Sequence, residues 1–488
     1  MKRILTGILL FLSLLPVSAQ TPAQRYVEEA VRKGPLEGAV VGLCVKDVQG
    51  RSVAAYNASL RLLPASNRKL VTTGVALHAL GPDYRFRTGL GYSGAIRDGI
   101  LEGDVYIIGG GDPSLASGDS IALRPDALFW KWKTLLREAG IQRIHGRIVG
   151  DGSAYESYLE HPTWEYGDIG IDYATGSDAL CFYENAIDFQ VSAAQVGKPV
   201  RCRQTYPETP WLHFSNHGLT GPEGSGNSLY LCATDLAPYA ELRGSFAVGR
   251  APKTEAFSNK FGALTCAYYF WKNLRETGWE VSGVYADIDR NGRVRGPDFV
   301  PQEKAVRARE IAYTEGARLE DIVRICNWRS DNFYAEGLLR ALGKQACGSA
   351  VYDSCLVAER KILKEMGVPA EGRAAFVDGS GLSRHNNVSP EWMCDYLLAV
   401  LKSPASEVFL SCLPQPGQGT LRPVKLPRPE RVRMKSGSFD GTLCYSGYVL
   451  DAQGRPRKAF SLLVNNALAP LSQIREELVK IIALLAEE

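Results

Sequence analysis

The residues with the clearest chemical potential are a serine and a lysine three positions apart, in the stretch PASNRKLVTT that begins at Pro64. Positions i and i+3 lie on one face of a helix, so Ser66 and Lys69 can come within hydrogen-bonding distance. A lysine that loses its proton through desolvation or a neighbouring cation can act as the base for a serine nucleophile. This is the only S-x-x-K of the chain, but a chain of this length contains about one by chance. The pair alone therefore leaves a solvated helix face as an equal alternative.

Two further motifs, downstream of this pair, supply the residue types that a Ser–Lys mechanism needs. Residues 330–332 read SDN at a predicted helix-to-loop position, and residues 435–437 read KSG at the start of a predicted strand. The KSG is a variant of the commoner K-T-G, and its serine keeps the hydroxyl group. S-x-x-K, S-D-N and K-[ST]-G in this order are the motifs of penicillin-recognising serine enzymes. The ordered set predicts an enzyme with Ser66 as its nucleophile.

Other catalytic arrangements have little support. Six histidines and the lack of a G-x-S-x-G segment argue against a Ser-His-Asp hydrolase. Without C-x-x-C or H-E-x-x-H, neither a metal nor a cofactor is expected. Two alternatives to SDN, SGN at residues 225–227 and YEN at residues 183–185, rank below it because they lie in an irregular region. Ser380, in DGSGLSR, is predicted to be a turn residue that shapes the cleft.

Composition and charge narrow the class further. A chain of 488 residues, 45% hydrophobic and 22% charged, is long enough for roughly two or three globular domains. With a formal net charge of +3, nothing indicates nucleic acid or an anionic membrane as the main partner. Eleven cysteines are too sparse for a disulfide scaffold. Whether Cys347 and Cys355 pair or remain free thiols is left open.

The first residues are typical of an export signal. MKRILTGILLFLSLLPVSAQ has a basic start, a short apolar run and small residues before Gln20, which predicts a cleaved signal peptide over residues 1–19. A membrane anchor is the alternative, and the short apolar run disfavours it. Since no later stretch is apolar enough to span a bilayer, the mature protein is expected to be exported to the periplasm without a transmembrane anchor.

The elements that must position the motifs alternate between helix and strand. Residues 38–57 predict two strands joined by a turn, and residues 66–80 predict the helix that carries the S-x-x-K. After residue 305 the pattern becomes strongly helical, and the chain ends in two strands and an amphipathic helix expected to pack on a sheet.

The simplest organisation is one α/β domain split in sequence by a large β-rich insertion after the S-x-x-K helix. The insertion would form one or two extra domains, one nested in the other. The predicted divisions are residues 20–88 plus 300–488 for the catalytic domain, 89–154 plus 256–299 for the first inserted domain, and 155–255 for the second.

The chain resembles the D-alanyl-D-alanine carboxypeptidase/endopeptidase family of low-molecular-mass class C penicillin-binding proteins, the penicillin-binding protein 4 type. Beyond the three motifs, the resemblance rests on GDVYIIGGGDPSL, DGSGLSRHNNVSP, GQGTLR, FSLLVNN and the long insertion between the first two motifs. It covers nearly the whole mature chain, more weakly between residues 155 and 255. The resemblance implies a β-lactamase/transpeptidase-like serine hydrolase domain of α/β (α+β) class.

The resemblance also implies roles for the motif residues. Ser66 would attack the scissile carbonyl, Lys69 would take its proton, and Lys435 would help to keep Lys69 neutral. Ser330 would pass a proton to the departing amine, and Asn332 would hold the substrate backbone and orient Lys69. The residues expected to bind substrate are Asp331, Ser436, Gly437 and Ser438.

Two further expectations concern how substrate would lie in the cleft. The oxyanion hole is expected at the backbone N–H groups of Ser66 and Ser438. Lys435 and Ser436 would bind the terminal carboxylate of the peptide, and the strand after Lys435 would pair with the peptide by β-addition.

The implied activity is hydrolysis of D-Ala-D-Ala termini, and of D-Ala-containing cross-links, in peptidoglycan through a Ser66 acyl-enzyme. Stem peptides and, as covalent inhibitors, β-lactams are the expected partners, and a homodimer is left open. A β-lactam hydrolase or related serine esterase on the same fold is the closest alternative, although no E-x-x-L-N segment supplies its deacylating base. A catalytically inactive cell-wall binding or scaffolding protein is the other, and the intact motif set disfavours it.

Overall fold

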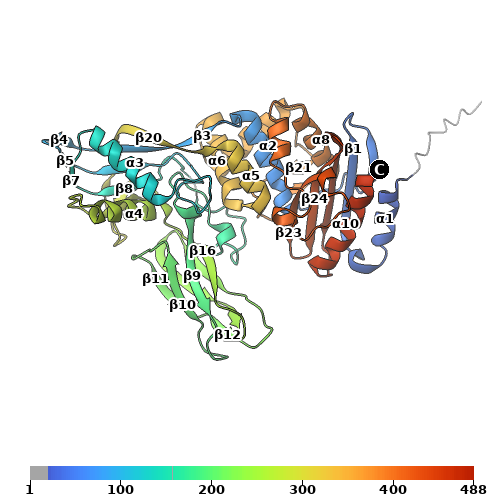
Figure 1. Ribbon diagram of the computed structural model, residues 1–488, viewed down its shortest axis with the longest axis horizontal. Helices are drawn as coiled ribbons and strands as arrows, with labels where there is room; N and C mark the ends of the chain where they lie inside the picture. The colour runs from blue at the N-terminus through green and yellow to red at the C-terminus, as the bar shows by residue number, and fades with distance from the viewer. Residues whose placement is uncertain (1–19, 157, 488) are drawn as a thin grey trace, which may run out of the picture.

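The computed structural model of the protein describes residues 20–156 and 158–487, and the predicted signal peptide lies outside this part of the chain. Figure 1 shows an elongated molecule with a helix-rich end, a sheet-rich end and a β-rich arm that projects to one side. The two terminal parts of the chain (blue, orange and red) form the helix-rich end, and the middle part forms the rest. The predicted mixture of helix and sheet with a long insertion is confirmed.

A five-stranded antiparallel sheet lies at the centre of the helix-rich end, in the order β2-β1-β25-β24-β23. Its strands are β1 (Val40–Asp47), β2 (Ser52–Tyr56), β23 (Val432–Phe439), β24 (Thr442–Leu450) and β25 (Pro456–Asn465). The β1–β2 hairpin matches the predicted strand pair. Every residue of β24 is buried, because helices cover both faces of the sheet.

Two groups of helices sandwich this sheet (Figure 1). One face packs on the terminal helices, α1 (Pro22–Ala30) and α10 (Leu471–Glu487), whose apolar side chains join those of the sheet in one core. This confirms that the last amphipathic helix packs on a sheet. The helices of the other side are α2 (Arg68–Leu80), α5 (Leu319–Ile325), α6 (Asn332–Cys347), α7 (Tyr352–Glu365), α8 (Pro390–Leu401) and α9 (Ser406–Ser411).

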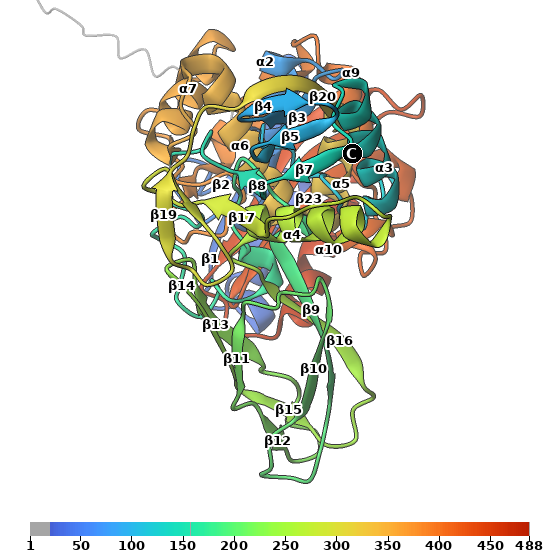
Figure 2. The same ribbon diagram turned by 90° about the vertical axis from the view of Figure 1, so that its left-hand side faces the viewer.

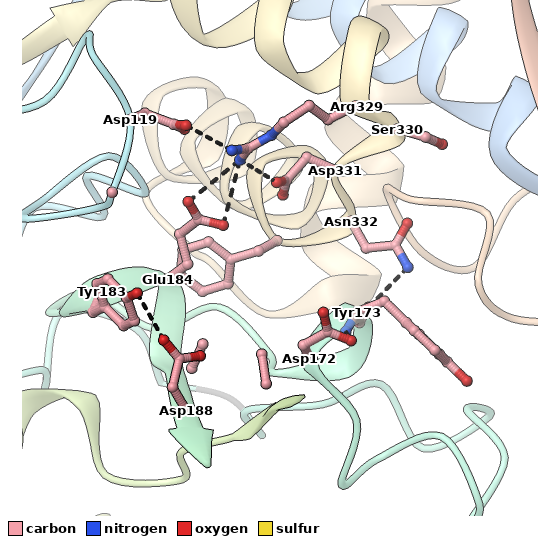
Figure 3. Close-up of a pocket in the computed structure, with 14 residues that line it drawn as sticks. Asp119, Asp172, Tyr173, Tyr183, Glu184, Asp188, Arg329, Ser330, Asp331 and Asn332 are labelled. Atoms are coloured by element: carbon pink, nitrogen blue, oxygen red, sulfur yellow. Dashed lines mark hydrogen bonds and ion pairs between the residues drawn. The ribbon is translucent and has the colours of Figure 1, made fainter. Parts of the chain in front are cut away.

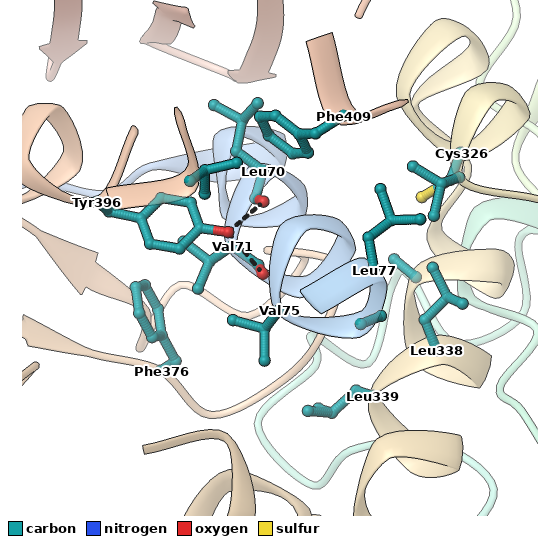
Figure 4. Packing of buried hydrophobic residues seen from close by; sticks show 14 of the residues in the cluster. Leu70, Val71, Val75, Leu77, Cys326, Leu338, Leu339, Phe376, Tyr396 and Phe409 are labelled. Atoms are coloured by element: carbon teal, nitrogen blue, oxygen red, sulfur yellow. Dashed lines mark hydrogen bonds between the residues drawn. The ribbon is translucent and has the colours of Figure 1, made fainter. Parts of the chain in front are cut away.

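Helix α2, which carries the predicted base, is held on all sides. Its residues from Arg68 to Leu77 are all buried, and Figure 4 shows its apolar side chains among those of the surrounding helices. The Tyr396 hydroxyl lies 3.0 and 3.2 Å from the carbonyl oxygens of Leu70 and Val71. Such close packing leaves the helix a single position relative to the sheet.

A seven-stranded mixed sheet forms the sheet-rich end, in the order β19-β18-β17-β8-β6-β3-β20. Helices α3 (Pro125–Glu138) and α4 (Gly262–Glu276) pack their apolar residues into one core with it. A small sheet of β4 (Ala95–Arg97), β5 (Ile100–Glu102) and β7 (Arg143–His145) adjoins it. The strands of the large sheet are β3 (Arg85–Tyr92), β6 (Val105–Ile108), β8 (Ile148–Asp151), β17 (Tyr285–Ile288), β18 (Arg293–Arg295), β19 (Pro301–Lys304) and β20 (Arg309–Arg318).

The region that looked irregular in the sequence folds mainly into the projecting arm, which Figure 2 shows from the side. Its strands are short, and β9 alternates half-buried and buried residues around a small separate core. Frequent Gly and Pro residues between the strands hide this period of two. The strands are β9 (Ala186–Ser192), β10 (Arg201–Tyr206), β11 (His213–Asn216), β12 (Leu219–Gly221), β13 (Tyr230–Thr234), β14 (Ala237–Arg243), β15 (Ser245–Ala247) and β16 (Lys253–Ser258).

Three remaining predictions concern cysteines, membrane spans and domain boundaries. All eleven cysteines lie in the described residues, and each is a free thiol, Cys347 and Cys355 included. Within residues 20–156 and 158–487, no helix has the length and hydropathy needed to cross a bilayer. The predicted boundary at residue 88 falls inside β3, and the division into domains stays a prediction.

Candidate active site

The predicted nucleophile and base lie where a short 3-10 helix runs into α2. Ser66 belongs to η2 (Ala65–Asn67), Lys69 lies in the first turn of α2, and the Ser66 Oγ and Lys69 Nζ are 2.9 Å apart. Ala65 has a left-handed φ of 46°, an uncommon conformation for a residue other than glycine. The helix thus begins within one residue of the predicted start, with a tighter first turn.

The Lys69 amine is fully buried and has three polar neighbours. Its Nζ donates hydrogen bonds to the Asn332 Oδ1 at 2.5 Å and to the Ser380 carbonyl oxygen at 2.7 Å. A neutral amine has two N–H groups and one lone pair. With both N–H groups directed at these two acceptors, the lone pair is left for the hydroxyl of Ser66. The geometry therefore suits a neutral lysine that accepts a proton from the serine.

Burial also favours the neutral form of this lysine. Desolvation lowers the pKa of Lys69 below its ordinary value, while the charges of nearby acidic groups, Asp378 and Glu336 among them, act in the opposite direction. Since no carboxylate forms an ion pair with the amine among the described residues, desolvation outweighs these more distant charges.

A second buried lysine faces the same space from the edge of the sheet. Lys435, on β23, donates hydrogen bonds from its Nζ to the Ser330 Oγ at 2.8 Å and to the Ser436 carbonyl oxygen at 2.7 Å. Burial lowers the pKa of Lys435 well below its ordinary value, and the charge of Lys69 lowers it further. The two lysines disfavour each other's protonation, as expected for a Ser–Lys site.

Gly437 explains how β23 approaches the nucleophile so closely. A Cβ at this position would lie 2.6 Å from the Pro64 carbonyl oxygen, 2.8 Å from the Ser66 nitrogen and 2.9 Å from the Asn67 nitrogen. All three contacts are with backbone, which cannot rotate away. Only glycine allows the strand to lie against η2.

The SDN motif forms the opposite side of the site. Ser330 ends a π-helical turn, η5 (Cys326–Ser330), with a left-handed φ of 63°, and Asn332 begins α6. A π-helical turn and a left-handed residue are both features that concentrate at functional sites. The Asp331 carboxylate caps α6, accepting from the Tyr334 N–H at 2.9 Å, and so its predicted contact with substrate stays a prediction.

The three remaining predicted residues follow Lys435 on β23. The Ser436 hydroxyl lies 2.7 Å from that of Thr420, and Ser438 is exposed at the surface of the strand. Gly437 lies between them and faces η2. Of the predicted catalytic residues, Ser66, Lys69 and Asn332 form one hydrogen-bonded group, and Ser330 and Lys435 form a second. Substrate binding by Asp331, Ser436, Gly437 and Ser438 stays a prediction.

Sequence reasoning missed the group that positions the Ser380 carbonyl. Glu336, on α6, is fully buried, and its carboxylate accepts hydrogen bonds from the backbone N–H groups of Gly379 at 3.0 Å and Ser380 at 2.7 Å. The predicted turn residue thus contacts Lys69 through its main chain. Burial, followed by the charge of Asp378, raises the pKa of Glu336 to about 7. The sequence signal that could have found it is a lone glutamate among apolar residues of a predicted helix, in the stretch FYAEGLL.

The insertion also reaches the site. The Asn332 Nδ2 donates to the Tyr173 carbonyl oxygen at 2.8 Å, which fixes the orientation of the amide so that its Oδ1 faces Lys69. From the same inserted region, the Trp164 Nε1 donates to the Asp378 carboxylate at 3.0 Å. The active site is therefore completed by residues outside the three motifs.

A cleft of about 400 Å³ separates the SDN motif from the insertion (Figure 3). Arg329, next to Ser330, bridges its walls: its guanidinium lies 2.6 Å from Asp119, 3.3 Å from Glu184 and 2.7 Å from Asp331. Burial, followed by the charge of Asp331, raises the pKa of Glu184 to about 8. With one arginine against three carboxyl groups, this part of the cleft is acidic.

Three features together define a class of protein. They are the buried Ser–Lys pair, the second buried lysine on a strand edge, and the polar loop that faces both. The class is that of serine hydrolases of the transpeptidase-like type, which transfer the acyl group of their substrate to a serine. Comparisons with known proteins lead to a family within this class.

The chain matches the model of the D-Ala-D-Ala carboxypeptidase 3 (S13) family over residues 23–485, and it belongs to this family. It is 28% identical over 459 residues to a D-alanyl-D-alanine carboxypeptidase of an Actinomadura species, covering 91% of this chain and 81% of the relative. Over 489 residues it is 26% identical to the D-alanyl-D-alanine carboxypeptidase DacB of Haemophilus influenzae, covering 95% of this chain and 93% of the relative.

The fold agrees with this assignment. The crystal structure of penicillin binding protein 4 (dacB) from Haemophilus influenzae superposes with a TM-score of 0.76 at 23% identity, covering 94% of this chain and 99% of that chain. The same protein in complex with a β-lactam superposes with a TM-score of 0.73. The chain is thus a serine-type peptidase of the D-Ala-D-Ala carboxypeptidase family, as the motifs predicted.

Proposed function

We propose that Ser66 hydrolyses peptides ending in D-Ala-D-Ala by forming an acyl-enzyme with the penultimate D-Ala. The observation that carries this proposal is the arrangement around Lys69, whose two acceptors leave its lone pair for the Ser66 hydroxyl. The Ser66 Oγ forms a bond to the carbonyl carbon while its proton passes to Lys69. The backbone N–H groups of Ser66 and Ser438 stabilise the oxyanion.

The leaving amine departs on the other side of the site. As the C–N bond breaks, Ser330, which accepts a hydrogen bond from Lys435, relays to the amine the proton that Lys69 took from Ser66. Water then adds to the acyl-enzyme and gives a proton to Lys69, which returns it to the Ser66 Oγ as the C–Oγ bond breaks. Lys435 and Ser436 bind the terminal carboxylate of the substrate, and Asp331 and Gly437 line the binding site.

We further infer that the enzyme acts in the periplasm, on the stem peptides of peptidoglycan, after cleavage of the predicted signal peptide. It also cuts D-Ala-containing cross-links, because a D-Ala amide bond within a cross-link offers Ser66 the same carbonyl. β-Lactams acylate Ser66, a proposal supported by the β-lactam complex of the Haemophilus influenzae relative. The division into a split catalytic domain and two inserted domains is part of this proposal.

Mass spectrometry of peptidoglycan fragments digested by the purified protein tests the function directly. We expect release of terminal D-Ala from pentapeptide fragments and slower conversion of cross-linked dimers to monomers. Recovery of unchanged fragments would overturn the proposal.

The lifetime of the penicillin adduct separates the peptidase from the β-lactam hydrolase. Labelled penicillin should give an adduct that survives for minutes or longer, because the sequence has no E-x-x-L-N segment to supply a deacylating base. Release within seconds would favour the β-lactam hydrolase.

A further inference from the structure

A second and larger cavity lies beside the catalytic cleft on the inserted side of the molecule. Its volume is about 870 Å³, within the range of roughly 300–1,000 Å³ that is usual for small-molecule sites. Its walls come from the loop before α3, the start of α3, the last turns of α4 and the end of β10. We call it the tyrosine groove. It shares Gly118, Asp119 and Tyr183 with the cleft beside SDN, so the two cavities adjoin.

Three tyrosines line the tyrosine groove. The ring of Tyr206 lies 4.7 Å from that of Tyr183 and 5.4 Å from that of Tyr269, in both cases edge-on. The hydroxyls of the outer two are engaged within the protein: Tyr183 donates to Asp188 at 3.0 Å, and Tyr269 accepts from the Glu208 N–H at 2.6 Å. Among the described residues, the Tyr206 hydroxyl has no hydrogen-bond partner. The groove therefore combines apolar ring surface with a free hydroxyl.

Polar side chains without partners surround these rings. Asp126, Asn273 and Glu276 line the groove, and their side chains make no hydrogen bond or ion pair within the described part of the chain. The Oδ1 of Asn273 is buried as well as unpartnered. A buried polar atom left without a partner costs about 1–3 kcal/mol, so the Asn273 amide has a hydrogen-bonding capacity that the protein leaves unused. Asp126 and Glu276 are exposed, and their carboxylates are open to a ligand.

The wall shared by the two cavities is built from strained backbone. Tyr183, Glu184 and Asn185 have consecutive left-handed φ values of 53°, 54° and 49° although none is a glycine. The fully buried Asn185 holds this turn, donating from its Nδ2 to the Gly176 carbonyl oxygen at 3.2 Å. The turn directs Tyr183 into the groove and Glu184 onto Arg329. Strain of about 1–3 kcal/mol per residue persists where the surrounding structure enforces it, typically at functional sites.

We propose that the tyrosine groove binds the sugar chain from which the stem peptides of peptidoglycan branch. This inference rests on the proposed function and extends its substrate from the peptide to the glycan. Tyrosine rings offer flat apolar surfaces to the C–H faces of sugars, and the carboxylates and amide beside them pair with hydroxyl and acetamido groups. A glycan held in the groove would keep its stem peptides beside the adjoining cleft.

A peptide fits this groove less well than a sugar. Recognition of an extended peptide uses the main-chain groups of an exposed strand edge. Here the walls are helix faces and loops, and a strand contributes only its last residue, Tyr206. The unpartnered groups are side-chain oxygens and an amide. Charges of both signs, including Lys272 and Arg124, argue against a strongly charged ligand.

The test compares binding of glycan with hydrolysis of peptide in the full mature chain. The probes are glycan strands stripped of their stem peptides by an amidase and a soluble sugar-free peptide ending in D-Ala-D-Ala. The variants are Tyr206→Ala and Asn273→Ala, with Tyr239→Ala as control, because Tyr239 is 65% exposed on the arm and lines neither cavity. Asn273→Ala keeps the test valid if loss of the Tyr206 ring disturbs packing.

Both groove variants should bind the stripped glycan at least about fivefold more weakly, the effect of losing about 1 kcal/mol, whereas Tyr239→Ala should bind as wild type. Hydrolysis of the sugar-free peptide should stay within about twofold of wild type in all three. The proposal would be overturned if the wild type did not bind the glycan, or if Tyr206→Ala and Asn273→Ala both bound it as tightly as the wild type. A raised KM for the sugar-free peptide in both groove variants would instead mark a peptide site. If the wild type bound glycan but hydrolysed no peptide, the proposed function would be refuted, whereas the proposal that the groove binds glycan would stand.

Discussion

The two walls of the catalytic cleft hold their charged groups in different ways. On the wall formed by α2 and β23, Lys69 and Lys435 are fully buried, and their contacts are neutral oxygens. On the inserted wall, Asp119 and Glu184 pair with Arg329, which lies next to Ser330 on the facing side and whose side chain is 45% exposed. Desolvation controls proton affinity on the first wall, whereas ion pairs partly open to solvent connect the second to the SDN motif.

This difference suggests that the first wall carries out the chemistry and the second wall affects which substrates bind. Fully buried amines with fixed partners keep the nucleophile and base in one arrangement, as proton transfer requires. Half-exposed ion pairs contribute little to stability, about 0–1 kcal/mol each, and can rearrange around different ligands. We expect substitutions on the first wall to change rate constants and substitutions on the second to change pH dependence and binding. The following predictions run from the largest expected effect to the smallest.

Ser66→Ala removes the nucleophile from the buried wall. We expect peptidase activity to fall by more than about 10⁴-fold and covalent labelling by penicillin to disappear. Gel labelling and intact mass measure this directly. Ser380→Ala is the matched control, because Ser380 contacts Lys69 through its carbonyl oxygen and should still be labelled. Labelled Ser66→Ala protein would rule out the assignment of the nucleophile.

Lys435→Ala should reduce carboxypeptidase activity by about 10²–10³-fold, the usual cost of losing one positioned charge or donor. Cleavage of cross-links should fall less, since an internal cross-link does not present the same terminal carboxylate. The ratio of the two activities on purified pentapeptide and dimer fragments is the measurement. An equal loss of both activities would argue against carboxylate binding by Lys435.

Gly437→Ala tests the close approach of β23 to η2. The new Cβ would lie 2.8 Å from the Ser66 nitrogen, so either the strand or the nucleophile must move. We expect the rate of acylation by penicillin to fall by about 10²-fold, as for a small misplacement of reacting groups. Gly167→Ala, where nothing lies within 4 Å of an added Cβ, is the control. Normal acylation of the Gly437 variant would show that the strand is free to move.

Glu336→Gln tests both the position of the Ser380 carbonyl and the effect of a buried charge on Lys69. An amide N–H group in place of one oxygen would repel the Gly379 and Ser380 N–H groups, and we expect kcat to fall by about tenfold. The ionised carboxylate raises the pKa of Lys69, so its removal should shift the acidic limb of kcat/KM to lower pH. Glu371→Gln, at an exposed position, is the control. A lower kcat with an unshifted pH profile would reduce Glu336 to a purely structural role.

Glu184→Gln probes the inserted wall and should have the smallest effect. The pKa of Glu184 is raised to about 8 in the folded state, against an ordinary value of 4.5. The folded state therefore binds the proton more tightly, and this group's contribution to stability is lost as pH rises from 4.5 to 8. The variant should match the wild-type Tm at low pH and exceed it slightly above pH 8. A lower Tm of the variant at pH 8 would mean that the ion pair with Arg329 dominates.

The sequence predicted the part of the site that depends on residue type and spacing. Helical geometry alone relates Ser66 to Lys69, and the order of the motifs located Ser330, Asn332 and Lys435. It did not reveal the Ser380 carbonyl or the Tyr173 carbonyl, because every residue carries a carbonyl group and only the fold selects two of them. The YEN triplet, ranked below SDN as a motif, owes its importance to three unusual φ values that its letters do not encode.

The arm shows the same limit at the level of the fold. Its strands are three to seven residues long, and β12, with three residues, is too short to establish a period of two. By contrast, α2 and the β1–β2 hairpin have long patterns with clear ends, and both were predicted closely.

The pairing of β1 with β25 has a consequence for the newly made chain. These strands come from opposite ends of the sequence, and the Leu63 carbonyl oxygen accepts from the Asn465 amide 402 residues away. The segment that carries Ser66 can therefore reach its final position only after the last strands have been synthesised. Closing so long a loop is slow compared with local folding. We expect the insertion to fold first and the peptidase to stay inactive until its C-terminal strands are available, so that activity would appear only once the whole chain is present.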